Sequence, residues 1–212
     1  RESNPPARAA AGQYHSLFID GEGRLSSYGC PPHPVPGLLG HGEGVTRLNT
    51  PTRLPSPLGG ARAVSVSAAQ YHSLALTAGG AVWSWGQGYL GALGHGDDQD
   101  QWQPTKIAAL AGQRVIAASA GAGHNLAITA DGGVWSWGSG VDGKLGHGDT
   151  QLQLLPKQVE ALAGRRVVAV SAGGEHSLAL TADGAVWSWG DGYFGKLGHS
   201  DQQAQLLPKQ VE

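Results

Sequence analysis

Three glycine-rich segments are the first residues in this sequence whose types and spacing could carry out chemistry. WGQGYLGALGH, WGSGVDGKLGH and WGDGYFGKLGH begin at Trp85, Trp137 and Trp189, and each contains G-x-G-x-x-G. In dinucleotide-binding proteins such glycines let the backbone approach a pyrophosphate at the start of a helix. No capped helical pattern follows any of the three segments. We therefore interpret these glycines as required by the loop's own geometry, and we expect no cofactor.

Evenly spaced histidines are the second candidate for chemistry. Eight of the nine histidines fall into two recurring sets, which are His15, His72, His124 and His176, and His41, His95, His147 and His199. A metal site needs ligands close together, with cysteine or carboxylate companions, whereas the two histidines of one copy are separated by about 23 residues. We expect each imidazole to bond the strand or loop backbone of a neighbouring segment, and we predict no metal site.

The His-Ser pairs raise the question of nucleophilic catalysis. His72-Ser73 and His176-Ser177 are adjacent in extended segments, so their side chains point to opposite faces and cannot exchange a proton directly. The third copy has Asn125 in place of the serine. We therefore predict no catalytic residues, no small-molecule substrate and no enzyme activity.

These residues recur because the chain is four copies of a unit of about 52 residues. We place the copies at 1–62, 63–114, 115–166 and 167–212, the first being degenerate and carrying a proline-rich loop. In the last copy, residues 165–174, 176–181 and 185–190 are expected strands, and Asp183-Gly184 is a tight-hairpin signal. Residues 205–212 form a fourth extended segment, whose proline favours a sheet edge. Trp85, Trp137 and Trp189 are expected to lie in the core.

Four strands in each repeat are typical of a propeller blade, because a single blade cannot bury its faces without neighbours. The sequence therefore predicts an all-β fold, a β-propeller of four-stranded blades. No helical stretch of ten residues is expected.

Composition restricts the environment and the partners. The net charge is −2, with 14 basic and 16 acidic residues spread along the chain, so no nucleic-acid-binding surface is expected. The single cysteine, Cys30, fits a reducing compartment, and no apolar run is long enough to cross a membrane. We expect an intracellular location, cytoplasmic or nuclear. The sequence lacks methionine and starts at Arg1, so we expect a piece of a longer protein.

The repeat resembles that of the regulator of chromosome condensation (RCC1) family. SAGGEHSLALTADGAVWSWGDGYFGKLGH carries the shared marks, which are A-G-x-x-H-S, the D-G hairpin, W-x-W-G and G-x-L-G-H. The resemblance implies a seven-bladed propeller, of which four repeats would form a partial arc. It also implies three activities: guanine-nucleotide exchange on a small GTPase, a regulatory role in a ubiquitin ligase, and ultraviolet-B reception. The family's photoreceptor branch has its sensing tryptophans in G-W-R-H-[ST], where this chain has GQYHS, AQYHS, GAGHN and GGEHS.

Binding is the function that these exclusions favour. Positions that vary between nearly identical copies are free for a partner to contact, and aromatic side chains on loops are good anchors. We therefore predict a non-catalytic protein-interaction scaffold within a larger protein. Its partner would be a small GTPase or a subunit of a large, for example cytoskeletal or ciliary, assembly. The candidate contact residues are Tyr89, Leu90, Trp102, Asp142, Lys144, Tyr193, Phe194 and Lys196. The alternative for Tyr193 and Phe194 is that they cover a neighbouring blade.

Overall fold

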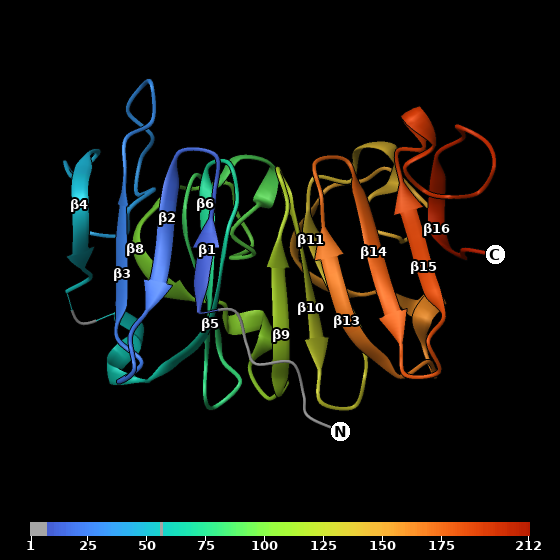
Figure 1. Ribbon diagram of the computed structural model, residues 1–212, viewed down its shortest axis with the longest axis horizontal. Helices are drawn as coiled ribbons and strands as arrows, with labels where there is room; N and C mark the ends of the chain where they lie inside the picture. The colour runs from blue at the N-terminus through green and yellow to red at the C-terminus, as the bar shows by residue number, and fades with distance from the viewer. Residues whose placement is uncertain (1–7, 56) are drawn as a thin grey trace.

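The computed structural model describes residues 8–55 and 57–212 as four antiparallel sheets of four strands each (Figure 1). Blade 1 contains β1 (Ala9–Ala11), β2 (His15–Ile19), β3 (Leu25–Gly29) and β4 (Leu48–Arg53). Blade 2 contains β5 (Ala63–Ala68), β6 (His72–Thr77), β7 (Val82–Gly86) and β8 (Gln101–Lys106). Blade 3 contains β9 (Val115–Ala120), β10 (His124–Thr129), β11 (Val134–Gly138) and β12 (Gln153–Gln158). Blade 4 contains β13 (Val167–Ala172), β14 (His176–Thr181), β15 (Val186–Gly190) and β16 (Gln205–Gln210).

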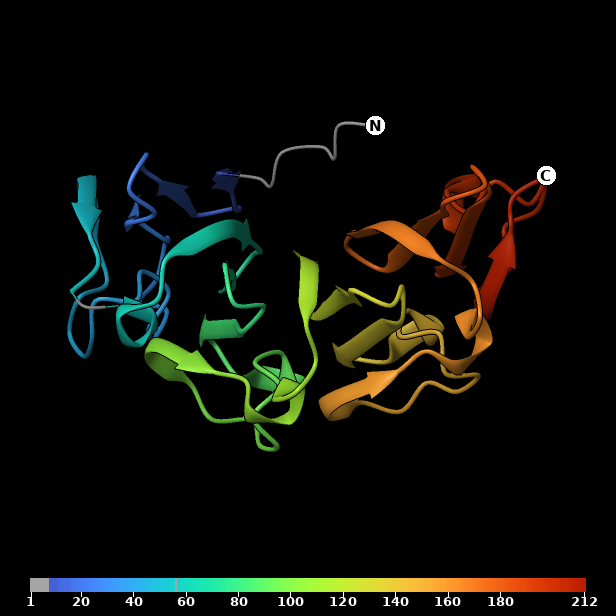
Figure 2. The ribbon, with the colours of Figure 1, turned by 90° about the horizontal axis from the view of Figure 1, so that it is seen from below.

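The four sheets follow one another along an arc, which Figure 2 shows along its axis. Each sheet has its strands in sequence order, and β1, β5, β9 and β13 contact one another in turn, so they form the inner wall. The fourth strand of each blade lies at the outer edge. The predicted all-β partial propeller is thereby confirmed.

Proline at the outer strands explains why each sheet stops there. Pro51, Pro104, Pro156 and Pro208 lie in β4, β8, β12 and β16, where the missing N–H costs no ladder hydrogen bond. The predicted edge position of the fourth segment is therefore correct.

The core lies between blades. All side chains of the second strands β6 and β10 are buried, because both faces of each sheet pack on a neighbour. Trp85, Trp137 and Trp189 are fully buried, as predicted. Trp189 packs with residues of blade 3, including Leu126 and Val159, so burial of each blade depends on the one beside it.

The connections between strands lie on two opposite faces of the arc, one at each end of the strands. We call these faces the loop end and the hairpin end. The loop end comprises the short turns at 12–14, 69–71, 121–123 and 173–175 and the long loops at 30–47, 87–100, 139–152 and 191–204. The hairpin end comprises the tight turns between the second and third strands and the segments that link one blade to the next. Antiparallel pairing alternates the strand direction, so every blade presents the same connections at the same end.

Short 3₁₀ turns are the only helical elements in residues 8–55 and 57–212. They are η1 (Pro57–Gly60), η2 (Tyr89–Gly91), η3 (Ala108–Leu110), η4 (Val141–Gly143), η5 (Glu160–Leu162) and η6 (Tyr193–Gly195). None is long and apolar enough to cross a membrane.

Candidate functional site

The glycines of the three long loops meet their own protein surroundings. A Cβ on Gly88 would lie 2.2 Å from the Gln99 carbonyl oxygen, and one on Gly140 would lie 2.1 Å from that of Gln151. Gly91 has φ +73°, a conformation that side chains disfavour. Each motif leads into a 3₁₀ turn of three residues and not into an α-helix. The loop's own backbone thus accounts for the glycines, in agreement with the structural interpretation.

The first histidine of blades 1, 2 and 3 reaches across to the next blade. The Nε2 atoms of His15, His72 and His124 lie 2.7, 2.7 and 2.8 Å from Ser73 Oγ, Asn125 Oδ1 and Ser177 Oγ. All six side chains are buried. This differs from the expected bond to backbone. The direct partner is a side chain, that of the residue directly after the first histidine of the next blade.

The direction of these bonds is set by a second contact. Ser177 Oγ donates to the Lys144 carbonyl oxygen at 2.8 Å, so its lone pair accepts the Nε2–H of His124. Asn125 acts in the same way, with its Nδ2 donating to the Ala92 carbonyl at 2.7 Å. His72 and His124 are therefore each linked, through the next blade, to the long loop of their own blade. We call this arrangement the blade relay.

Burial keeps the relay imidazoles neutral. It lowers the pKa of His15 to about 4, with a smaller contribution from His72. Burial is also the largest cause that lowers the pKa of His124 to about 3. A neutral imidazole has one N–H, and His72 and His124 use it at Nε2.

The second histidine of each repeat anchors the long loop to its own blade. Ser84 Oγ donates to the Leu93 carbonyl at 2.7 Å and lies 3.0 Å from His95 Nε2. The same arrangement recurs in every blade, with Ser27, Ser136 and Ser188 bonding His41, His147 and His199 at 2.9 to 3.0 Å. In the part of the chain that the structure describes, no three His, Cys, Asp or Glu side chains form a group that could hold a metal ion.

The anchored loops present apolar side chains at the loop end. Tyr89 is 67% exposed, Val141 51%, Tyr193 61% and Phe194 89%. Tyr89 is exposed although its turn packs on blade 3, so a neighbouring blade does not cover the side chain at this position. Leu90 is half-buried because its turn packs on β12 of the next blade. Phe194 has the same position in blade 4, the last blade of the described arc, so its exposure does not mark a free surface.

The middle residue of each turn has a left-handed backbone. Leu90, Asp142 and Phe194 have φ of 56, 57 and 61°. A residue other than glycine pays about 1–2 kcal/mol for this conformation. The turn directs the preceding side chain, Tyr89 or Tyr193, away from the blade.

The remaining predicted contact residues divide into accessible and inaccessible ones. Lys144 is only 3% exposed and its Nζ lies 2.5 Å from Glu175 Oε2 of blade 4, so it belongs to the blade boundary and not to an open surface. Lys196 is paired with Asp191 in its own loop, and Asp142 is exposed.

Trp102 lies elsewhere, half-buried on the outer strand β8. With Glu43 and Gln103 it lines a shallow cavity of about 410 Å³ between the loop of blade 1 and blade 2.

Charge is distributed unequally between the two ends. Among the described residues the loop end carries nine carboxylates and three cations, and the two lysines are both paired. The carboxylates are those of Glu43, Asp97, Asp98, Asp100, Asp142, Asp149, Glu175, Asp191 and Asp201, and the cations are Arg47, Lys144 and Lys196. The hairpin end carries the other ten cations, which are Arg8, Arg24, Arg53, Arg62, Lys106, Arg114, Lys157, Arg165, Arg166 and Lys209. Six carboxylates accompany them, those of Asp20, Glu22, Asp131, Glu160, Asp183 and Glu212.

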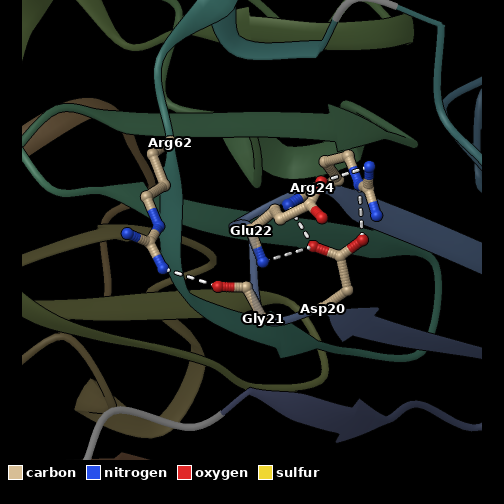
Figure 3. A network of polar contacts seen from close by, with 5 residues as sticks. All are labelled: Asp20, Gly21, Glu22, Arg24 and Arg62. Carbon is tan, nitrogen blue, oxygen red and sulfur yellow. Dashed lines mark hydrogen bonds and ion pairs between the residues drawn. The ribbon is translucent and has the colours of Figure 1, made fainter.

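Figure 3 shows how the hairpin end of blade 1 uses its charged groups internally. Asp20 accepts the Nε–H of Arg24 at 2.6 Å, and Arg24 also pairs with Glu22. Arg62, just before β5, donates to the Gly21 carbonyl at 2.8 Å and so ties blade 1 to the start of blade 2. These groups stabilise the turn and leave fewer charges free for a partner.

Sequence reasoning missed the relay acceptors and the inner aromatic pair of the loop end. The sequence did contain a signal for the acceptors, because a serine or an asparagine directly follows the first histidine of every repeat. Tyr14 and Tyr71 stack with ring centroids 5.7 Å apart, and His33 lies 6.1 Å from Tyr71. Tyr14 and Tyr71 directly precede the first histidine of blades 1 and 2, where the photoreceptor motif has arginine, and its tryptophan position holds Gln13 and Gln70.

Comparison with known proteins agrees with this architecture. The family model described as "Regulator of chromosome condensation (RCC1) repeat" matches residues 79–128, 131–180 and 183–212. The chain is 39% identical to the E3 ubiquitin-protein ligase HERC2 of Homo sapiens, covering 95% of this chain and 4% of that protein. It is also 39% identical to the ultraviolet-B receptor UVR8 of Arabidopsis thaliana, covering 98% of this chain and 47% of the receptor.

A solved structure supports the same relationship. Prp20p of Saccharomyces cerevisiae, described with its binding to Gsp1p and histones, superposes with a TM-score of 0.81 at 27% identity. The superposition covers 96% of this chain and 49% of Prp20p. The chain thus spans half or less of each of these proteins. On its repeats, its blades and these similarities, it belongs to the RCC1 repeat family.

Proposed function

We propose that this chain is a non-catalytic protein-binding segment of a propeller within a larger protein, and that its partner docks on the loop end. The observation that carries the proposal is the set of exposed apolar side chains Tyr89, Val141 and Tyr193 on three consecutive loops, since Tyr89 and Val141 stay exposed although a following blade packs on their turns. They occupy positions that vary between repeats, while the histidines, glycines and tryptophans around them are bonded or buried within the propeller.

Rigidity of the loops supports this proposal. The long loop of every blade is held by a serine–histidine contact to its own blade, and the loops of blades 1 to 3 also bond the backbone of the next blade, such as Gly96 N–H to the Leu154 carbonyl at 3.0 Å. Exposed aromatic side chains on a fixed backbone lose little entropy when a partner covers them. Such residues are the usual anchors of protein interfaces.

A second candidate is a regulatory propeller of a ubiquitin ligase or of a GTPase exchange factor. The similarity to HERC2 favours the first and the similarity to Prp20p favours the second. Both are compatible with partner binding at the loop end, and they differ in what the rest of the protein does. Ultraviolet-B reception is not proposed, because Gln13, Gln70, Ala122 and Gly174 stand where the photoreceptor motif has tryptophan.

Sedimentation of the tagged full-length protein in cell extract tests the proposal. The variant Tyr89→Ser/Tyr193→Ser/Phe194→Ser should sediment as the free protein, whereas the wild type should sediment as a larger complex. Leu155→Ser/Leu207→Ser is the matched control, because these leucines are about half exposed but lie on outer strands. If the loop variant keeps the complex and the control loses it, the proposed surface is wrong. Nucleotide release from a small GTPase, measured with the same variants, separates the exchange-factor alternative.

A further inference from the structure

The loop end combines apolar anchors with an excess of negative charge, and this combination specifies the chemistry of a partner. Tyr89 is followed in its loop by Asp97, Asp98 and Asp100, and Val141 is adjacent to Asp142. The two lysines of this end are already neutralised by Glu175 and Asp191. Arg47 is therefore the one cation of the described loop end outside an ion pair, and the exposed apolar side chains lie among uncompensated carboxylates.

Several of these carboxylates are held in place by the backbone. Asp97, Asp149 and Asp201 occupy the same position in blades 2, 3 and 4, and each accepts the N–H two residues later at 2.9 to 3.1 Å. This contact uses Oδ1 and leaves Oδ2 for another donor. One carboxylate thus recurs at a fixed place in each of three successive loops, while the aromatic side chains stand at the turns.

Resting on the function proposed above, we propose that the loop end takes a basic protein segment that also carries apolar side chains. Lysine or arginine side chains of the partner lie against the carboxylates of successive loops, and apolar side chains cover Tyr89, Val141 and Tyr193. Phe194 contacts Tyr193 edge to face, with ring centroids 5.5 Å apart, and so helps to hold the Tyr193 ring in place. The opposite end, with ten cations against six carboxylates, repels such a segment and fixes the orientation of docking.

Binding of synthetic peptides to the full-length protein tests the proposal by fluorescence anisotropy. The first probe is a 12-residue peptide of lysine, arginine and leucine, and two matched probes replace its leucines by serine or its basic residues by glutamate. The basic apolar peptide should bind most tightly, and its affinity should fall as salt rises. Asp97→Asn/Asp98→Asn/Asp142→Asn/Asp201→Asn should weaken it by about tenfold, from four exposed ion pairs of modest strength each. Asparagine keeps the Oδ1 acceptor, so the loops remain folded.

Glu22→Gln/Glu160→Gln/Glu212→Gln is the matched control, because it removes carboxylates at the hairpin end and should change affinity less than twofold. Equal weakening by both variants would overturn the proposal, since it would indicate attraction by net charge alone. Equal binding of the serine-containing peptide would overturn the role of the apolar anchors. If the asparagine variant keeps the native complex in cell extract and the Tyr89→Ser/Tyr193→Ser/Phe194→Ser variant loses it, the loop end is the surface but its partner is not basic. Retention of the complex by both variants contradicts the proposed function itself.

Discussion

Removing one hydroxyl from the blade relay should weaken the contact between blades 3 and 4. Ser177 is fully buried, and Ser177→Ala leaves the Nε2–H of His124 without an acceptor. The Lys144 carbonyl keeps the indole N–H of Trp189 at 2.9 Å, so only one polar group is orphaned. A buried donor without a partner costs about 1–3 kcal/mol, and alanine is close to serine in volume. We expect a loss of about 2 kcal/mol in the free energy of unfolding.

The assay is urea unfolding followed by tryptophan fluorescence, since the chain has seven tryptophans. Ser16→Ala is the matched control, because Ser16 has the same position in blade 1 but is only half-buried and no described imidazole bonds it. It should cost less than about 0.5 kcal/mol. His124→Phe combined with Ser177→Ala should cost at least about 1 kcal/mol less than the sum of the single changes. Amide exchange at Ala122, whose N–H bonds the Gly173 carbonyl across the same boundary, should speed up. If Ser177→Ala is no worse than Ser16→Ala, the relay is not a stabilising contact.

Three further predictions concern pH, the loop glycines and the buried lysine. Because the pKa of His15 is about 4 and that of His124 about 3 when folded, the unfolded chain binds more protons below pH 6.5. The free energy of unfolding should be highest above pH 6.5 and should fall toward pH 4 by up to about 1.4 kcal/mol per pH unit for each such histidine. Urea midpoints measured across this pH range should show the fall, and His124→Phe should reduce its slope. Gly143→Ala would place a Cβ 2.6 Å from Leu206 Cα and should lower the free energy of unfolding by at least about 1 kcal/mol. The control is Gly174→Ala, whose Cβ would meet no atom within 4 Å. Equal changes in melting temperature for the two variants would contradict this role of Gly143. Glu175→Gly leaves the ammonium of Lys144 buried and unpaired and should cost about 3 kcal/mol. Adding Lys144→Ala should restore most of that loss, because Ala92 and Gly123 occupy the same two positions at the preceding boundary; a double variant as unstable as the single would refute the pairing.

The fold could be predicted from the sequence because the repeat makes each signal appear several times. The Asp183-Gly184 hairpin, the edge prolines and the buried tryptophans all follow from local rules and were found where expected. The histidine contacts were only partly predictable. A sequence indicates that a buried imidazole needs a partner, but the partner of His124 is Ser177, 53 residues away, and only the stacking of blades brings them together.

The candidate site was harder to predict for the same reason. Lys144 and Lys196 have the same position in the repeat, yet Lys144 is buried against Glu175 and Lys196 bonds within its loop. Variation between repeats identified both but could not distinguish a contact between blades from a free surface. The charge difference between the two ends was also hidden, because acidic and basic residues alternate along the chain and separate only when the strands reverse direction.

Photocrosslinking in cells shows whether a partner protein binds at the loop end. A benzophenone amino acid would replace Tyr89, Val141 or Tyr193 at the loop end, or Glu22, Ala130 or Ala182 at the hairpin end, in the full-length protein. We predict crosslinks to a common protein from all three loop-end positions, and none to that protein from the hairpin end. Crosslinks to one protein from the hairpin end alone, or no crosslinks from either end, would show that no partner binds at the loop end.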